Sequence, residues 1–146
     1  MENFYFNLIE FGTPEFDEAL ALRTEVLRKP LNMVFYEDDI AKEYNETHIG
    51  CYNSLHDLVG VLTLKSLDNG NQKMRQVAVS ATIQNQGIGK SLVQFSEMYA
   101  RSKGTQRIEL NARDTAVPFY RAIGYQVEGE IFQEVGIDHR YMWKDV

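Results

Sequence analysis

The segment QNQGIGKS, residues 84–91, has residue types and spacing suited to binding an anion. Gly87, Gly89 and Lys90 fall at the start of an apolar helical pattern, and no Asp or Glu accompanies them. A lysine there opposes the helix dipole by roughly 0.3–1 kcal/mol, and an interior glycine costs about 1 kcal/mol relative to alanine. A bound anion reverses the first penalty, and glycines give it close access to backbone N–H groups. The segment predicts an anion-binding helix start, with an ordinary helix start and an exposed lysine as the alternative.

Two known nucleotide-binding motifs do not fit this segment. The phosphate-binding loop of nucleotide hydrolases requires G-x-x-x-x-G-K-S/T directly after a strand, but Gln84 stands at the first glycine position. Several residues also separate Gln84 from the preceding apolar run, which ends at Val79. The dinucleotide fingerprint G-x-G-x-x-G fails because Leu92 replaces its third glycine. The sequence therefore favours a different kind of anion-binding loop.

The elements that position this segment can be predicted from local patterns. Thr13 is a candidate N-cap, Pro14 is suited to the first helical turn, and Pro30 predicts the end of that helix. Gly104 and Gly124 predict the ends of two later helices, over residues 87–104 and 115–123. The strands are predicted at residues 4–11, 47–52, 57–67, 73–79 and 106–112, with two closing strands within 125–144.

This element order predicts an α/β (α+β) fold with a mixed, twisted central sheet flanked by helices. The strands at Lys73 and Arg107 are separated by one helix, so we expect them to be parallel and joined by a right-handed crossover. The length of 146 residues and the hydrophobic share of 44% indicate a single domain, residues 1–146.

Charge and cysteine content exclude several classes of function. The net charge is −6, and residues 1–50 hold 11 acids and 4 bases, so nucleic acid is not an expected partner. The densest acidic part, residues 36–46, is interpreted as a solvated face, with attraction of a cationic partner as the alternative. The sequence has no signal-peptide pattern, no apolar run of membrane-spanning length and one cysteine. We expect a soluble cytoplasmic protein without a membrane partner or a metal, and a homodimer is an open possibility.

Three motifs together resemble the GNAT superfamily of N-acetyltransferases. They are Gln84-x-x-Gly87-x-Gly89 at a helix start, the strand IELNA, and the segment AVPFYRAIGYQ. The family signature pairs R/Q-x-x-G-x-G/A with F-Y-x-x-x-G-F/Y. The resemblance is specific from about Lys73 to Tyr125. It implies two splayed parallel strands that form a wedge for the pantetheine arm of acetyl-CoA, with the pyrophosphate on the loop amides.

The resemblance also implies roles for individual residues. Tyr120 matches the tyrosine that protonates the departing CoA thiolate in many members, and Asn111 would steady the cofactor arm; without the family context they would be a packing aromatic and a turn residue. The residues expected to contact acetyl-CoA are Val77, Ala78, Val79, Gln84, Gln86, Gly87, Ile88, Gly89, Lys90, Ser91, Asn111, Phe119 and Tyr120.

The general base is not identified by the resemblance. Family members often have a glutamate on the strand before the loop, where this chain has Gln76. Acetyl transfer to an amine still needs a proton acceptor, because an alkylammonium has a pKa near 10. The candidates are Glu134 and His139, with Glu37 and His48 on the acceptor side.

Two further groups bear on the chemistry. A backbone N–H at Val79 is a candidate donor to the thioester oxygen. Cys51 is predicted to face the core together with Ile49, which argues against a covalent acyl-cysteine route.

The predicted activity is the transfer of an acetyl group from acetyl-CoA to a primary amine of a small molecule or peptide, by direct attack. The alternative is a non-catalytic acetyl-CoA-binding sensor or scaffold domain. The tyrosine at position 120 favours the enzyme, since a domain that only binds acetyl-CoA needs no proton donor at the thiol.

Overall fold

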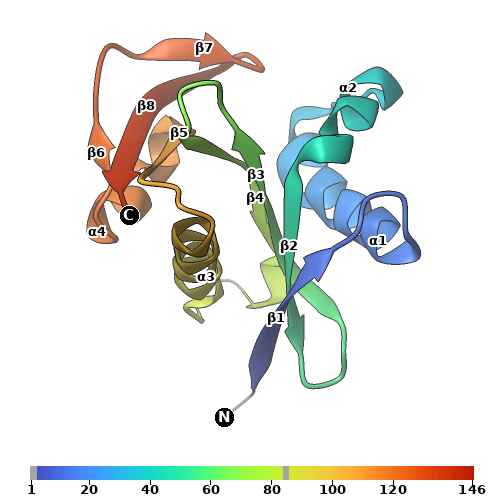
Figure 1. Cartoon of the computed structure of the whole chain (residues 1–146). Helices are drawn as coiled ribbons and strands as arrows, with labels where there is room; N and C mark the ends of the chain where they lie inside the picture. The colour runs from blue at the N-terminus through green and yellow to red at the C-terminus, as the bar shows by residue number, and fades with distance from the viewer. Residues whose placement is uncertain (1–2, 84–85) are drawn as a thin grey trace.

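The computed structural model describes residues 3–83 and 86–146, in which eight strands form one sheet. The strands are β1 (Phe4–Ile9), β2 (Thr47–Asn53), β3 (Leu58–Ser66), β4 (Gln72–Val79), β5 (Arg107–Arg113), β6 (Gln126–Val127), β7 (Phe132–Glu134) and β8 (Ile137–Asp145). The α-helices of the described part are α1 (Pro14–Arg23), α2 (Glu37–Ala41), α3 (Ile88–Ser102) and α4 (Val117–Ala122). The predicted mixed sheet flanked by helices is confirmed (Figure 1).

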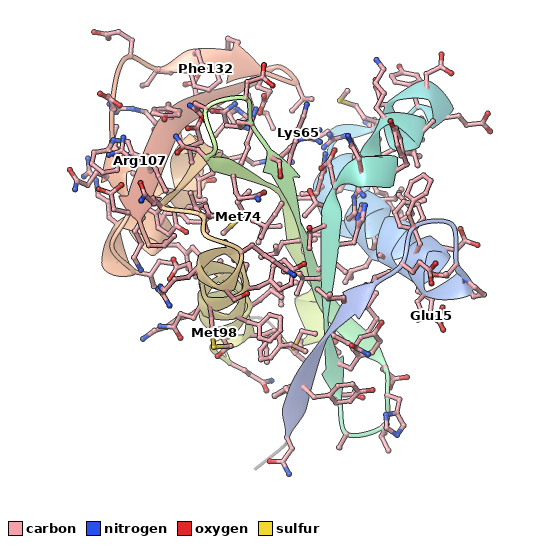
Figure 2. The ribbon with its side chains drawn as sticks, viewed as in Figure 1. Glu15, Lys65, Met74, Met98, Arg107 and Phe132 are labelled. Carbon is pink, nitrogen blue, oxygen red and sulfur yellow. The ribbon has the colours of Figure 1, made fainter. Side chains whose placement is uncertain are left out.

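The sheet is divided between β4 and β5. Its order is β1-β2-β3-β4-β5-β8-β6, with β7 paired to β8, and β4–β5 is the parallel pair. These two strands pair only from Gln72↔Ile108 to Met74↔Leu110, although both continue further. Figure 1 shows the two halves of the sheet separating, and Figure 2 labels Met74 between them, above α3. The predicted splayed parallel strands are therefore present.

A β-bulge in β4 lies where the two strands part. In the β3–β4 ladder, Thr63 is opposite Arg75 and Val61 is opposite Ala78, so Gln76 and Val77 together oppose one residue of β3. Gln76 has φ +57°, which is uncommon for a residue other than glycine. A bulge bends its strand and disrupts regular pairing, so this one turns the end of β4 away from β5.

The two faces of the sheet carry separate cores. Alternate residues of one strand point to opposite faces, so Leu62 packs in the cluster beneath α3 while Val61 packs in the cluster beneath α1. Leu92 and Val93 of α3 are completely buried in the first cluster, and Phe16 of α1 is buried in the second. Helices α1 and α3 therefore cover opposite faces (Figure 1).

The first helix begins as predicted but ends earlier. The Thr13 hydroxyl accepts a hydrogen bond from the Phe16 amide at 3.2 Å, and Pro14 opens the helix. The α-helix ends at Arg23 and continues as a π-helical turn, Thr24–Arg28, and a 3₁₀ turn, Lys29–Leu31. Proline lacks the N–H that a regular helix requires, and Pro30 falls within this last turn. Leu27 and Arg28 lie on the wider π-helical turn.

The acidic segment is only partly a solvated face. Glu37, Asp38 and Asp39 are exposed in the first turn of α2. Glu43, in contrast, is buried and accepts two hydrogen bonds of 2.7 Å from the buried Arg23 guanidinium. Glu46 is also buried and pairs with an arginine of β4 at 2.8 Å. Buried carboxylates need such partners, which sequence spacing alone did not reveal.

The C-terminal part has one strand more than predicted. Residues 125–145 form β6, β7 and β8 instead of two strands, because β7 and β8 make a tight hairpin at Glu134 and Ile137. Val135 and Gly136 at its tip both have positive φ, +47° and +73°, as a two-residue hairpin turn requires.

Candidate active site

A cavity of about 340 Å³ occupies the gap where β4 and β5 separate. The π-helical turn after α1, the bulge of β4, the end of β5, helix α4 and the β7–β8 hairpin all contribute to its walls. Five predicted site residues line it, namely Val77, Asn111, Tyr120, Glu134 and His139. It also contains residues that the sequence did not single out for the site, among them Arg28, Arg75, Gln76, Arg113 and Val135.

Tyr120 is held on α4 with its side chain 7% exposed. Its ring packs edge-on against Phe119 and Tyr125, with centroid distances of 5.0 and 5.7 Å. Burial raises the pKa of its hydroxyl above the ordinary value, so the group keeps its proton at physiological pH. Among the described residues this hydroxyl has no hydrogen-bond partner, and Tyr120 is one of the residues that line the cavity. Tyr120 therefore brings a protonated side chain to the cavity wall.

Glu134 and His139 face each other across the β7–β8 hairpin. The His139 Nε2 atom lies 3.5 Å from Glu134 Oε2, and Asn111 Nδ2 lies 3.5 Å from Glu134 Oε1. The His139 Nδ1 atom is 2.8 Å from the Ile137 carbonyl oxygen, which can only accept a hydrogen bond, so Nδ1 carries a proton. A proton added at Nε2 would form an N–H group that is directed toward the Glu134 carboxylate. The pair is suited to accepting a proton.

The helix start of α3 forms a separate part of the site. Gly87 is its N-cap with φ +78°, a conformation that glycine adopts without strain. The first turn contains no acidic residue, and Lys90 and Ser91 are exposed. The first N–H groups of a helix have no partner within it, so this turn can receive an anion. Gln84 lies outside the described residues.

The other predicted cofactor residues of the loop differ in their surroundings. A Cβ atom on Gly89 would lie 3.4 Å from Phe119 and 3.8 Å from Val79, so three predicted residues meet at this point. Gln86 is exposed, whereas the side chains of Ile88 and Ala78 are buried in the two cores. Val79 pairs with Gly60 of β3, and its predicted role as an amide donor stays a prediction.

The two residues expected on the acceptor side lie outside the cavity lining. His48 is 4% exposed, and its Nε2 atom is 3.0 Å from the Glu43 carbonyl oxygen. The ring of Phe16 packs against it at 5.1 Å because helix α1 covers this face of β2. Glu37 is exposed in the first turn of α2.

Cys51 lies in the core beneath α3, as predicted, with no exposed surface. Burial raises the pKa of its thiol from 9.0 to about 11, which suppresses the reactive thiolate. It is also absent from the cavity lining. These observations disfavour an acyl-cysteine route.

A family model described as "Acetyltransferase (GNAT) domain" matches residues 19–146. The chain therefore belongs to the GNAT acetyltransferase family. It is 32% identical over 129 residues to YjcF, an uncharacterized N-acetyltransferase of Bacillus subtilis, and the match covers 88% of this chain and 91% of that protein.

Solved structures share the fold at lower identity. An acyl-CoA N-acyltransferase from Pseudomonas aeruginosa superposes with a TM-score of 0.81 and 20% identity, covering 99% of both chains. A GNAT family acetyltransferase from Elizabethkingia anophelis with acetyl-CoA bound gives a TM-score of 0.76 and 17% identity, also over 99% of both chains. Family membership supports an acyl or acetyl transfer from coenzyme A. Within the described ranges, no helix is both long and apolar enough to cross a bilayer.

Proposed function

We propose that this protein transfers the acetyl group of acetyl-CoA to a primary amine of a small molecule or peptide, by direct attack of the amine. The observation that carries the proposal is the cavity at the β4–β5 split. It is bordered on one side by the protonated hydroxyl of Tyr120 and on another by the Glu134–His139 pair. A proton donor and a proton acceptor therefore face one space, as acyl transfer to an amine requires.

The residues around the split fit acetyl-CoA. Beyond Met74 and Leu110 the strands no longer pair, which leaves room for an extended arm between them. The first turn of α3, with its glycines, Lys90 and Ser91, offers backbone N–H groups to a pyrophosphate. When bound, acetyl-CoA supplies the acetyl group as a reactive thioester.

The side chains of the cavity divide the proton transfers between them. His139, supported by Glu134, accepts the proton that the acceptor ammonium must lose, because only a neutral amine is a nucleophile. As the new N–C bond forms and the C–S bond breaks, Tyr120 donates its proton to the departing sulfur. Asn111 holds the Glu134 carboxylate toward the cavity through its 3.5 Å contact. The attacking nitrogen also loses a second proton as it becomes the amide nitrogen; solvent takes up this proton and returns one to Tyr120, and His139 releases its own proton to solvent.

The experiment that tests this function measures free CoA thiol when the purified protein receives acetyl-CoA and a panel of primary amines and peptides. The one cysteine of the chain is buried, so a thiol reagent added to the native protein reports CoA alone. We expect at least one amine to raise CoA release well above the rate without an acceptor. If calorimetry detects acetyl-CoA binding while every acceptor leaves that rate unchanged, the non-catalytic sensor or scaffold replaces this proposal.

A further inference from the structure

Two guanidinium groups on the cavity wall donate to one and the same carbonyl oxygen. Arg28 Nη1 lies 3.1 Å from the Leu27 oxygen, and Arg113 Nη2 lies 3.0 Å from it. Leu27 belongs to the π-helical turn after α1, and Arg113 is the last residue of β5. The shared acceptor brings together two positive side chains from two different elements of the cavity wall.

Neither of these guanidinium groups has a carboxylate partner. In the described part of the chain, no Asp or Glu lies within ion-pair distance of Arg28 or Arg113. The neighbouring arginines differ, since Arg23 is paired with Glu43 and Arg75 is paired with Glu46. Among the described residues, Arg23 and Arg75 thus form ion pairs, whereas Arg28 and Arg113 on the cavity wall form none, and the Glu134 carboxylate acts on Arg28 only from beyond ion-pair distance.

The surroundings of Arg28 disfavour the positive charge of its guanidinium group. Burial lowers the pKa of its guanidinium below the ordinary value, and the charges of Arg113, Arg23 and Arg75 lower it further. Glu134 is the one neighbour that acts in the opposite direction. Phe35 supports the side chain from beneath, with the guanidinium 4.2 Å from its ring centroid. The guanidinium is therefore held in position, partly desolvated and short of negative charge, which is the state that a bound anion would relieve.

The phosphates of CoA are not the anion that this position suggests. The described residues of the α3 helix start, 86–91, are absent from the cavity that contains Arg28 and Arg113. Glu134, in contrast, lies within the same cavity and makes the contact with His139. A molecule with an ammonium near Glu134 and an anionic group near the arginines would match the charges of this wall at both ends.

We propose that the acceptor is an amine that also carries a carboxylate or a phosphate, and that Arg28 and Arg113 bind this anionic group. The proposal rests on the acetyltransferase function proposed above and specifies its substrate class. Arginine is suited to either group because its planar fork makes paired hydrogen bonds to carboxylate and phosphate oxygens. A net positive wall disfavours polyamines, which would bring further positive charge.

The test compares amines that differ only in the anionic group. Phenylalanine is set against phenethylamine, and O-phosphoethanolamine against ethanolamine, with spermidine as the polycationic probe. For wild type we expect kcat/KM to be about tenfold or more higher for the anionic member of at least one pair, because hydrogen bonds to charged groups are worth about 1.5–3 kcal/mol. The pair that shows the preference distinguishes carboxylate from phosphate.

Variants connect this preference to the two arginines. In Arg113→Gln and Arg28→Gln the ratio within the preferred pair should fall by about tenfold. Arg113→Lys should give an intermediate ratio, because it retains the charge but loses the fork. Arg107→Gln is the matched control, since Arg107 lies on the same strand outside the cavity and pairs with Asp145. Circular dichroism and thermal denaturation establish that each variant is folded.

A binding measurement separates this proposal from the proposed reaction. N-acetylphenylalanine and N-acetylphenethylamine are titrated into the protein in the presence of CoA, where no chemistry is needed. Tighter binding of the carboxylate, lost in Arg113→Gln, supports the anion site even if no amine is acetylated. Equal wild-type kcat/KM within both pairs, or a preference that survives both Gln variants, overturns the proposal while leaving the acetyltransferase intact. Weaker acetyl-CoA binding in Arg113→Gln with an unchanged ratio would assign the guanidinium to the cofactor instead.

Discussion

The His139 Nε2 atom lies 3.5 Å from the Glu134 carboxylate, while its Nδ1 atom donates a hydrogen bond to the Ile137 carbonyl. The β7–β8 hairpin sets the position of both side chains. A proton transferred from an ammonium to Nε2 would therefore lie beside a carboxylate, which stabilises the charged ring.

Replacing either member of this pair should slow the chemical step. His139→Gln and Glu134→Gln should lower kcat by roughly 10²–10⁴-fold and 10-fold or more respectively, because general base catalysis contributes in this range. Steady-state kinetics with an accepted amine measures kcat, with His56→Gln as the control at an exposed histidine. A wild-type kcat in both variants would assign proton removal to water.

Tyr120→Phe removes one hydroxyl and keeps the buried ring. Turnover should fall by about 10²–10⁴-fold if this group protonates the leaving sulfur, whereas acetyl-CoA affinity should change little. Tyr125→Phe is the matched control, because the Tyr125 hydroxyl donates to Glu97 at 2.9 Å in the core. That variant should lose about 1–3 kcal/mol of unfolding free energy without the same loss of turnover. Full turnover in Tyr120→Phe would leave Tyr120 with a packing role.

Gly89→Val should weaken acetyl-CoA binding. The new side chain would begin 3.4 Å from Phe119 and obstruct access to the helix-start amides. Losing a hydrogen bond to a charged phosphate corresponds to a roughly tenfold or greater rise in Kd. Isothermal titration calorimetry with acetyl-CoA measures this Kd in wild type and in the variant. Gln94→Val introduces the same β-branched residue at an exposed position of α3 and controls for helix propensity. Lys90→Ala should cost less, and an unchanged Kd in Gly89→Val would remove the loop from the cofactor site.

The bulge in β4 can be tested through Gln76. Gln76→Val places a β-branched residue at φ +57° and should lower the unfolding free energy by about 1–3 kcal/mol. Gln76→Gly adopts this φ without strain and should retain the bulge. Acetyl-CoA affinity should decrease in the valine variant and persist in the glycine variant, because the bulge opens the wedge. Equal affinities and stabilities would mean that the bulge does not depend on this residue.

The buried thiol of Cys51 predicts a loss of stability at alkaline pH. Its pKa is raised from 9.0 to about 11, so below pH 9 the thiol is protonated in both the folded and the unfolded state. Between pH 9 and 11 the unfolded state releases the proton first, and the unfolding free energy falls by up to about 1.4 kcal/mol per pH unit. Urea denaturation of wild type and Cys51→Ala at pH 8, 9 and 10 measures this slope. The variant should be less stable at pH 8 but decline less steeply, and parallel declines would contradict the assignment to Cys51.

Local sequence patterns were sufficient for most elements because the forces that define them act between near neighbours. Thr13 caps the first helix, Gly104 ends α3 with φ +86°, and Cys51 and Ile49 face the core as strand alternation predicted. The helix start at Gly87 and the tyrosine at position 120 were recognisable because a motif preserves their spacing along the chain.

The acceptor side could not be predicted in the same way. Arg28 lies on the π-helical turn that follows α1 and contacts the Leu27 carbonyl, and Arg113 contacts that carbonyl from a strand 85 positions further along the sequence. The strand alternation places His48 on the face that was expected to line the cleft, but in the structure Phe16 of helix α1 packs over its ring. Ion pairs such as Arg23 with Glu43 depend on packing between distant segments. These pairs decide which charged side chains are neutralised and which are not. No periodicity or spacing encodes that packing, so only the tertiary structure determined which charges face the cavity.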